Sequence, residues 1–274
     1  MTNESTSAEN YLHGHAAPVV RHHGMRTAAE TAAFLLPELT PDMRLLDVGC
    51  GPGSITIGLA ERLPDGEVIG IDTSEPTLAQ AAADAKARGI ANLRYELGNV
   101  YELAFEDDSF DVVYAHQVLQ HLGNRQAALT EMLRVVKPGG IVAVRDVDWG
   151  SAVFWPPEPW LDRFLEVYQK TARSQGGEPN MGRQMRSLFN EAGIADCQVT
   201  AAVWCYATTA ATTTWADTYA ERLISTSIGQ LAVDNGFATR AEIEAMAAAF
   251  RDWARRPGAT WMFIHAAALA RKPA

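Results

Sequence analysis

The chain has 274 residues, of which 47% are hydrophobic, so it is long enough to bury one large core. Acidic residues outnumber basic ones by 33 to 23, and no Lys/Arg run would follow a phosphate backbone, which argues against nucleic acid as a partner. Its three cysteines show no C-x-x-C spacing, and no run of ~18 apolar residues indicates membrane insertion. We therefore expect a cytoplasmic protein without a structural metal.

The segment before residue 40 is unusually rich in histidine. Four of the seven histidines lie between residues 13 and 23, ahead of a helix expected from Thr27 to Leu36. Thr27 followed three residues later by Glu30 is typical of a capping box at the start of a helix. The histidines could hold a metal or could lie as polar side chains over the domain, and their spacing favours the second interpretation.

Residues 45–60, LLDVGCGPGSITIGLA, are the most informative stretch. An apolar run long enough for a buried parallel strand is followed by a turn with three glycines and then by apolar residues at helical spacing. Glycines let the backbone approach a ligand closely, and the free N–H groups at a helix start favour an anionic group. A dinucleotide fingerprint, G-x-G-x-x-G, would require glycine where Ser54 stands, so the spacing here is G-x-G-x-G.

The next two strands end in residues that suit a nucleoside. A strand expected over 67–72 ends in Asp72, whose carboxylate can accept hydrogen bonds from both hydroxyls of a ribose, and Thr73 follows it. A helix over 75–88 starts at the cap Ser74. A third strand over 92–97 then leads into Asn99 and Val100.

A fourth strand, VVYA, runs into the segment AHQVLQHL, which contains His116 and His121. Since ligands bind at the carboxyl ends of strands in an open parallel sheet, His116 should face the ligand. His121 is either a base or a packed residue, and the second reading is favoured. A helix over 124–136 ends in the turn residues KPGG before a fifth strand over 141–147.

Taken together, the glycine loop, Asp72, Gly98-Asn99-Val100, the V-L-x-H-L pattern around His121 and KPGG resemble a known family. They are similar to class I S-adenosylmethionine-dependent methyltransferases of the ubiquinone/menaquinone-biosynthesis type, most strongly over residues 40–147. The resemblance implies an α/β fold with a Rossmann-like, doubly wound sheet of seven strands, mostly parallel with an antiparallel last strand. It also implies S-adenosyl-L-methionine as cofactor and a small-molecule methyl acceptor, such as an isoprenoid or aromatic metabolite methylated at O, C or N.

The resemblance also suggests which residues form the site. In relatives an Asp commonly stands at the position of Asn99 and binds the adenine amine, so the amide would make a weaker contact. The N-terminal arm matches Tyr-x-x-Gly-His … Arg-x-His-x-x-Arg-Thr-Ala-Glu, a segment that in relatives folds over the cofactor. The expected cofactor-binding residues are Asp47, Gly49, Gly51, Gly53, Asp72, Thr73, Asn99, Val100, His116, Tyr11 and His23. The candidate bases for the acceptor's proton are His116, His121, His15 and Asp146.

The second half of the chain is expected to complete the sheet and cover it. Arg145 and Asp146 either hold the substrate or pair with each other. A loop over 155–160 is followed by helices over 161–174 and 183–192, and strands are expected over 198–208 and 261–270. Two helices between these strands, separated by a turn at 234–237, would form a lid over the carboxyl edge.

These elements predict four parts: a covering arm at 1–40, a cofactor-binding domain at 41–210, a helical lid at 211–257 and a last strand at 258–274. Two alternative functions are an NAD-dependent oxidoreductase and a protein that binds S-adenosylmethionine without catalysis. The sequence leaves homo-oligomerisation open.

Overall fold

The computed structural model describes residues 26–273, so the expectations for Tyr11, His15 and His23 lie outside the described residues. It contains a seven-stranded sheet in the order β3-β2-β1-β4-β5-β7-β6. The five strands from β3 to β5 pair in parallel, and β7 is antiparallel to both of its neighbours, as predicted. The strands are β1 (Arg44–Val48), β2 (Glu67–Asp72), β3 (Leu93–Leu97), β4 (Phe110–His116), β5 (Val136–Trp155), β6 (Gln198–Tyr206) and β7 (Thr260–Arg271).

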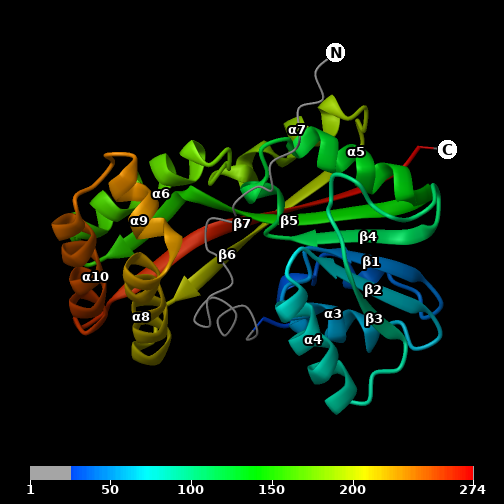
Figure 1. Cartoon of the computed structure of the whole chain (residues 1–274), viewed down its shortest axis with the longest axis horizontal. Coiled ribbons are helices and arrows are strands. Elements are labelled where there is room, and N and C mark those ends of the chain that lie inside the picture. The colour runs from blue at the N-terminus through cyan, green and yellow to red at the C-terminus, as the bar shows by residue number, and fades with distance from the viewer. Residues whose placement is uncertain (1–25, 274) are drawn as a thin grey trace.

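Helices cover both faces of the parallel part of the sheet (Figure 1). Apolar side chains of α2 (Ala28–Thr31) and α3 (Ser54–Ala60) form a core with one face. Those of α5 (Arg125–Val135) and α7 (Met185–Glu191) form a core with the other, while α4 (Glu75–Ala87) packs on β2 and β3. Such two-sided coverage explains why the central strands β1 and β4 are mostly buried, whereas the edge strand β3 carries Arg94 and Glu96.

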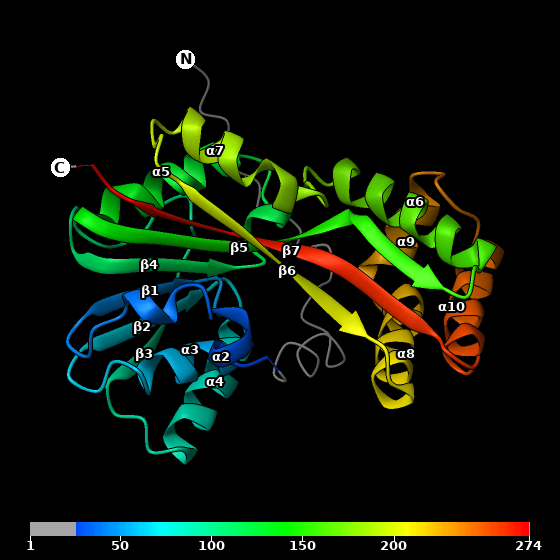
Figure 2. The same ribbon diagram turned by 180° about the vertical axis from the view of Figure 1, so that it is seen from behind.

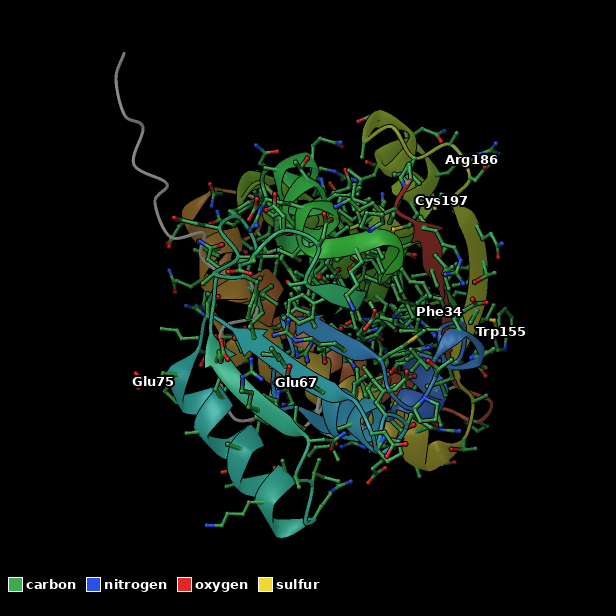
Figure 3. The ribbon with its side chains drawn as sticks, turned by 90° about the vertical axis from the view of Figure 1, so that its right-hand side faces the viewer. Phe34, Glu67, Glu75, Trp155, Arg186 and Cys197 are labelled. Carbon is green, nitrogen blue, oxygen red and sulfur yellow. The ribbon has the colours of Figure 1, made fainter. Side chains whose placement is uncertain are left out.

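Strand β5 is much longer than the predicted 141–147. It pairs with β7 from Ile141 to Trp155, and its partner β4 ends opposite Arg145. From Asp146 onward, β5, β7 and β6 therefore run on beyond the carboxyl ends of the other strands (Figures 1 and 2). We call this part the strand extension; at its end, Trp155 lies at the surface of the molecule (Figure 3) and is 64% exposed.

Four helices pack on the strand extension and form a second body with it, which we call the helical half. They are α6 (Pro159–Ser174), α8 (Thr209–Ser225), α9 (Ser227–Asp234) and α10 (Arg240–Ala254). Their core is aromatic and includes Trp149, Phe164, Trp215, Phe250 and Trp261. Among the described residues, no helix combines the length and apolarity needed to cross a bilayer.

Two helix predictions need correction. The helix expected from Thr27 to Leu36 is a single turn, α2, followed by a 3-10 helix over Leu36–Glu38; the cap is confirmed, since Thr27 Oγ1 accepts from the Glu30 N–H. The insertion between β6 and β7 holds three helices rather than two, because Thr226 ends α8 and caps α9 with its own hydroxyl. One threonine is too weak a signal to predict such a break.

Candidate active site at the carboxyl edge of the sheet

The glycine loop joins β1 to α3 and has three left-handed residues: Gly49, Gly51 and Gly53 have φ of 69°, 53° and 76°. A Cβ on Gly49 would lie 2.5 Å from Val118 Cγ2, and one on Gly53 would lie 2.2 Å from Tyr95 Oη. A Cβ on Gly51 would meet nothing within 4 Å. Two of the glycines are therefore required by packing within the protein, whereas Gly51 borders open space that fits a bound cofactor.

Asp72 ties the end of β2 to this loop. Its Oδ2 accepts from the Gly51 N–H and its Oδ1 from the Ser74 N–H, both at 3.0 Å. A carboxylate has about four lone-pair sites, so each oxygen keeps one for a hydroxyl of a ribose. Thr73, beside it, is exposed. The half-buried Asp72 is thus held in place by two backbone N–H groups, and its contact with a ribose stays a prediction.

Asp47 lies beneath the loop rather than along its open side. It is 2% exposed, and the Thr56 hydroxyl donates to its Oδ2 at 2.7 Å. Burial raises the pKa of Asp47 to about 7, with a smaller contribution from the charge of Asp72, while the bond from Thr56 opposes the rise. Asp47 joins β1 to α3 and so supports the loop; a direct contact with the cofactor stays a prediction.

Asn99 and Val100 follow β3 at the same edge, since Leu97 pairs with Asp72 across the sheet. The Asn99 side chain is exposed, and its Oδ1 accepts from the Tyr101 N–H at 3.0 Å. Val100 is 7% exposed and packs in the core. Because one lone pair of the amide oxygen is already used in this turn, the adenine contact of Asn99 also stays a prediction.

His116 ends β4 between two aromatic rings. Its ring centroid lies 6.5 Å from that of Tyr114 and 6.3 Å from that of Trp204. Neither ring nitrogen has a hydrogen-bond partner among the described residues. Burial lowers the pKa of His116 well below its usual value, and the charges of Arg26 and Arg145 act in the same direction. The imidazole is therefore neutral.

Gln117, which follows, has a φ of 55°, a conformation that non-glycine residues seldom adopt. Its N–H donates to the Arg145 carbonyl at 2.7 Å, and its side chain lies 2.7 Å from His265 Nε2. Strained backbone of this kind is concentrated at functional sites.

Arg145 and Asp146 do not pair with each other, contrary to one of the two predictions for them. Arg145 Nη1 donates to the carbonyls of Glu30 and Thr31, whereas Asp146 Oδ2 accepts from the Leu119 N–H. Successive residues of a strand point to opposite faces, which separates the two side chains. Burial raises the pKa of Asp146 well above its usual value, and its bond from the Leu119 N–H ties it to the segment that contains His121, which suits a positioning role.

His121 lies at the rim of a small open cleft. Burial lowers the pKa of its imidazole to about 3, and the charges of Arg222 and Arg26 contribute. The cleft is lined by Gln120, His121, Tyr168, Ala172, Gln175, Gly177 and Pro179. Of the four candidate bases, His121 is placed beside this cleft, His116 and Asp146 do not line it, and His15 lies outside the described residues.

Sequence reasoning missed the side chains that β6 and β7 bring to this site. The Trp204 ring stacks on that of His265 at 3.9 Å, and the guanidinium groups of Arg26 and Arg145 each lie 5.6 Å from the Trp204 ring centroid. The available signal was the alternation of side chains between the two faces of each strand. Which of their faces meets the site depends on pairing across the sheet.

The comparisons with known proteins agree with this geometry. Residues 39–209 match the family model described as "Methyltransferase domain". The chain is 36% identical over 205 residues to an uncharacterized methyltransferase of Schizosaccharomyces pombe, covering 72% of this chain and 73% of the relative. It is 43% identical over 126 residues to a demethylmenaquinone methyltransferase of Geobacillus stearothermophilus, covering 46% and 50%.

Among solved structures, a putative methyltransferase from Bacillus halodurans has the same fold. The TM-score is 0.59 at 19% identity, with 90% of this chain and 100% of that chain covered. The family match contradicts the alternative of an NAD-dependent oxidoreductase. The dinucleotide fingerprint would also require a third glycine where this chain has Ser54. The chain therefore belongs to the methyltransferase-domain family and is a class I S-adenosylmethionine-dependent methyltransferase.

Proposed function

We propose that this methyltransferase acts on a small, partly aromatic or isoprenoid acceptor that binds between the carboxyl edge of the sheet and the helical half. The observation that carries this proposal is the cleft beside His121, which combines apolar walls from Tyr168, Ala172 and Pro179 with polar side chains such as Gln175. Sites for small molecules are typically lined in this way, by apolar side chains with a few polar groups. A net charge of −10 also argues against a nucleic-acid acceptor.

S-adenosylmethionine, when bound, supplies an electrophilic methyl group on a sulfonium, so the protein need not activate a leaving group. Gly51 and Asp72 would hold the adenosine part, as their open space and free lone pairs allow. The rings of Trp204, Tyr206 and Tyr168 would exclude water and orient the acceptor. Alignment of this kind can contribute about 7 kcal/mol or more to catalysis.

We assign His121 the role of accepting a hydrogen bond from the reacting group of the acceptor. With a pKa of about 3 its imidazole is a weak base in the free enzyme, so binding of the acceptor must raise this pKa before His121 takes the proton. Its neutral state follows from the lowered pKa, and its position at the cleft gives it access. Asp146 would position it, because its carboxyl group accepts from Leu119 in the 3-10 helix that ends at His121. The buried His116 would pack against the site.

Two measurements test these assignments. Metabolite fractions incubated with radiolabelled S-adenosylmethionine should yield a labelled small molecule; label found only in macromolecules would overturn the proposed acceptor class. Cofactor binding without transfer to any fraction would instead support the non-catalytic alternative.

For the base, His121→Asn should lower kcat by about 10²-fold or more while leaving cofactor affinity unchanged. Gln175→Ala, at the same cleft, is the matched control and should retain most of the kcat. Wild-type turnover in His121→Asn would show that another group takes the proton.

A further inference from the structure

Helix α8 contains a buried arginine, Arg222, with one hydrogen-bond partner among the described residues. Arg222 is 2% exposed, and its Nη1 donates to Tyr219 Oη at 3.3 Å. Its Nε and Nη2 have no hydrogen-bond partner among residues 26–273, and no carboxylate in that range forms an ion pair with it. The Tyr219 ring, 5.0 Å away, is its one aromatic partner in the same range.

This arrangement is costly for the free protein. A guanidinium remains charged when it is buried, and the effective penalty for removing it from water is several kcal/mol. A cation–π contact offsets only about 0.5 to 2 kcal/mol of that penalty. The other buried arginine described above, Arg145, also lacks a carboxylate partner, but its Nη1 donates to two backbone carbonyls. Arg222 therefore differs from Arg145, because among the described residues it has neither a carboxylate nor a carbonyl partner.

The position of Arg222 places it at the acceptor side of the site. Trp215, Tyr219 and Arg222 lie at i, i+4 and i+7 of α8, so they share one face of the helix. That face packs on the strand extension, where the Trp215 ring stacks on Tyr206 at 4.6 Å.

Electrostatics point to the same neighbourhood. Burial is the main influence that lowers the pKa of His121 and raises those of Tyr206 and Tyr219. The charges of Arg222 and Arg26 act on all three groups in addition to burial. The aromatic core connects the cleft with α8, because the rings of Tyr168, which lines the cleft, and of Tyr219 each lie 5.7 Å from the ring of Phe164.

We propose that Arg222 binds a carboxylate of the methyl acceptor, so that the substrates are small aromatic or isoprenoid acids. The proposal rests on the methyl-transfer function and acceptor position proposed above. The planar fork of a guanidinium matches the two oxygens of a carboxylate, and the two nitrogens without partners are Nε and Nη2, which lie on one edge of the fork. Aromatic rings at Tyr219, Tyr206 and Trp215 would cover the apolar body of such an acid.

A bound carboxylate would also change the neighbouring histidine. The negative charge would offset the effect of Arg222, so the pKa of His121 should rise when the acid binds. The imidazole would then be a stronger proton acceptor in the complex than in the free enzyme.

The test compares matched acid and amide probes on the full chain saturated with S-adenosylhomocysteine. Benzoate and cinnamate should bind at least about tenfold more tightly than benzamide and cinnamamide by calorimetry. Arg222→Gln should remove this preference, whereas Arg251→Gln, an exposed arginine of α10, should keep it. Equal binding of acid and amide by the wild type, or an unchanged preference in Arg222→Gln, would overturn the proposal.

A second variant separates binding from folding. Arg222→Met removes a charge without a carboxylate partner, so the Tm of the free protein should stay the same or rise. A Tm several degrees lower would indicate a structural arginine and overturn the assignment. S-adenosylhomocysteine affinity should be unchanged in both variants. Failure of the wild type to bind it would overturn the methyl-transfer function itself, whereas intact binding without acid preference would reject Arg222 alone.

Discussion

The two halves of this molecule prepare for their ligands in opposite ways. The parallel part of the sheet with its helices, which we call the cofactor half, has a defined backbone geometry: a glycine loop with one position open to solvent and a carboxylate that receives two N–H groups. The helical half has side chains from distant elements, among them the buried Arg222 and His265 and the half-buried Trp204. Under the assignments proposed above, the cofactor is recognised by a short local motif, whereas the acceptor site is built from long-range packing.

Asp72→Ala should have the largest effect on the cofactor half. The ribose hydroxyls would lose their hydrogen bonds to the Asp72 carboxylate, which should weaken S-adenosylmethionine binding by about 2 to 4 kcal/mol. The bonds to Gly51 and Ser74 are lost as well. Calorimetry measures the change, and Glu75→Ala, an exposed neighbour, is the control. An unchanged dissociation constant would refute the assignment.

Asp47→Asn should change how stability depends on pH. The folded pKa is about 7 against an ordinary 3.8, so between these values the folded state holds a proton that the unfolded state has released. Raising the pH from about 5 to about 8 should therefore destabilise the wild type relative to the variant by about 3 kcal/mol. Urea denaturation of the free protein tests this, with the exposed Asp65→Asn as control. Parallel stability curves for wild type and Asp47→Asn would contradict it.

Gly51→Ala and Gly89→Ala form a matched pair. Both glycines have positive φ, 53° and 73°, and a Cβ on either would meet no atom within 4 Å. Each substitution should cost about 1 kcal/mol of stability through backbone strain. Only Gly51→Ala should also lower cofactor affinity, by about tenfold, or ~1.4 kcal/mol. Equal affinities in the two variants would mean that the open space beside Gly51 is not the cofactor site.

Thr239→Ala should show that the helical half can be weakened without disturbing the cofactor half. Thr239 and Glu242 form a capping box at the start of α10, and removing it should cost about 1 kcal/mol. For a chain of this size the Tm should fall by about 2 to 4 °C. Thr213→Ala, at an exposed threonine within α8, should have almost no effect. A fall in cofactor affinity for Thr239→Ala would show that the halves are coupled.

Local chemistry was enough to predict the strand over 67–72 and the strand–glycine loop–helix unit. They were recognised because turn residues and apolar periodicity act over a few residues. In the insertion, Ile228, Met246, Phe250 and Trp253 recur near helical spacing and are buried, although Ile224 is 44% exposed. These features depend on neighbours along the chain.

Three features were decided only by the tertiary structure: the length of β5, the place of His265 and the burial of Arg222. Each depends on residues far apart in sequence. The continuation of β5 to Trp155 requires β7 as its partner, more than 100 residues later. The same strand β7 places His265 beside Gln117. The packing of α8 against α10 and β6 leaves Arg222 buried without a carboxylate partner among the described residues. Strand register and helix packing are set by the burial of whole faces, which no short stretch of sequence specifies.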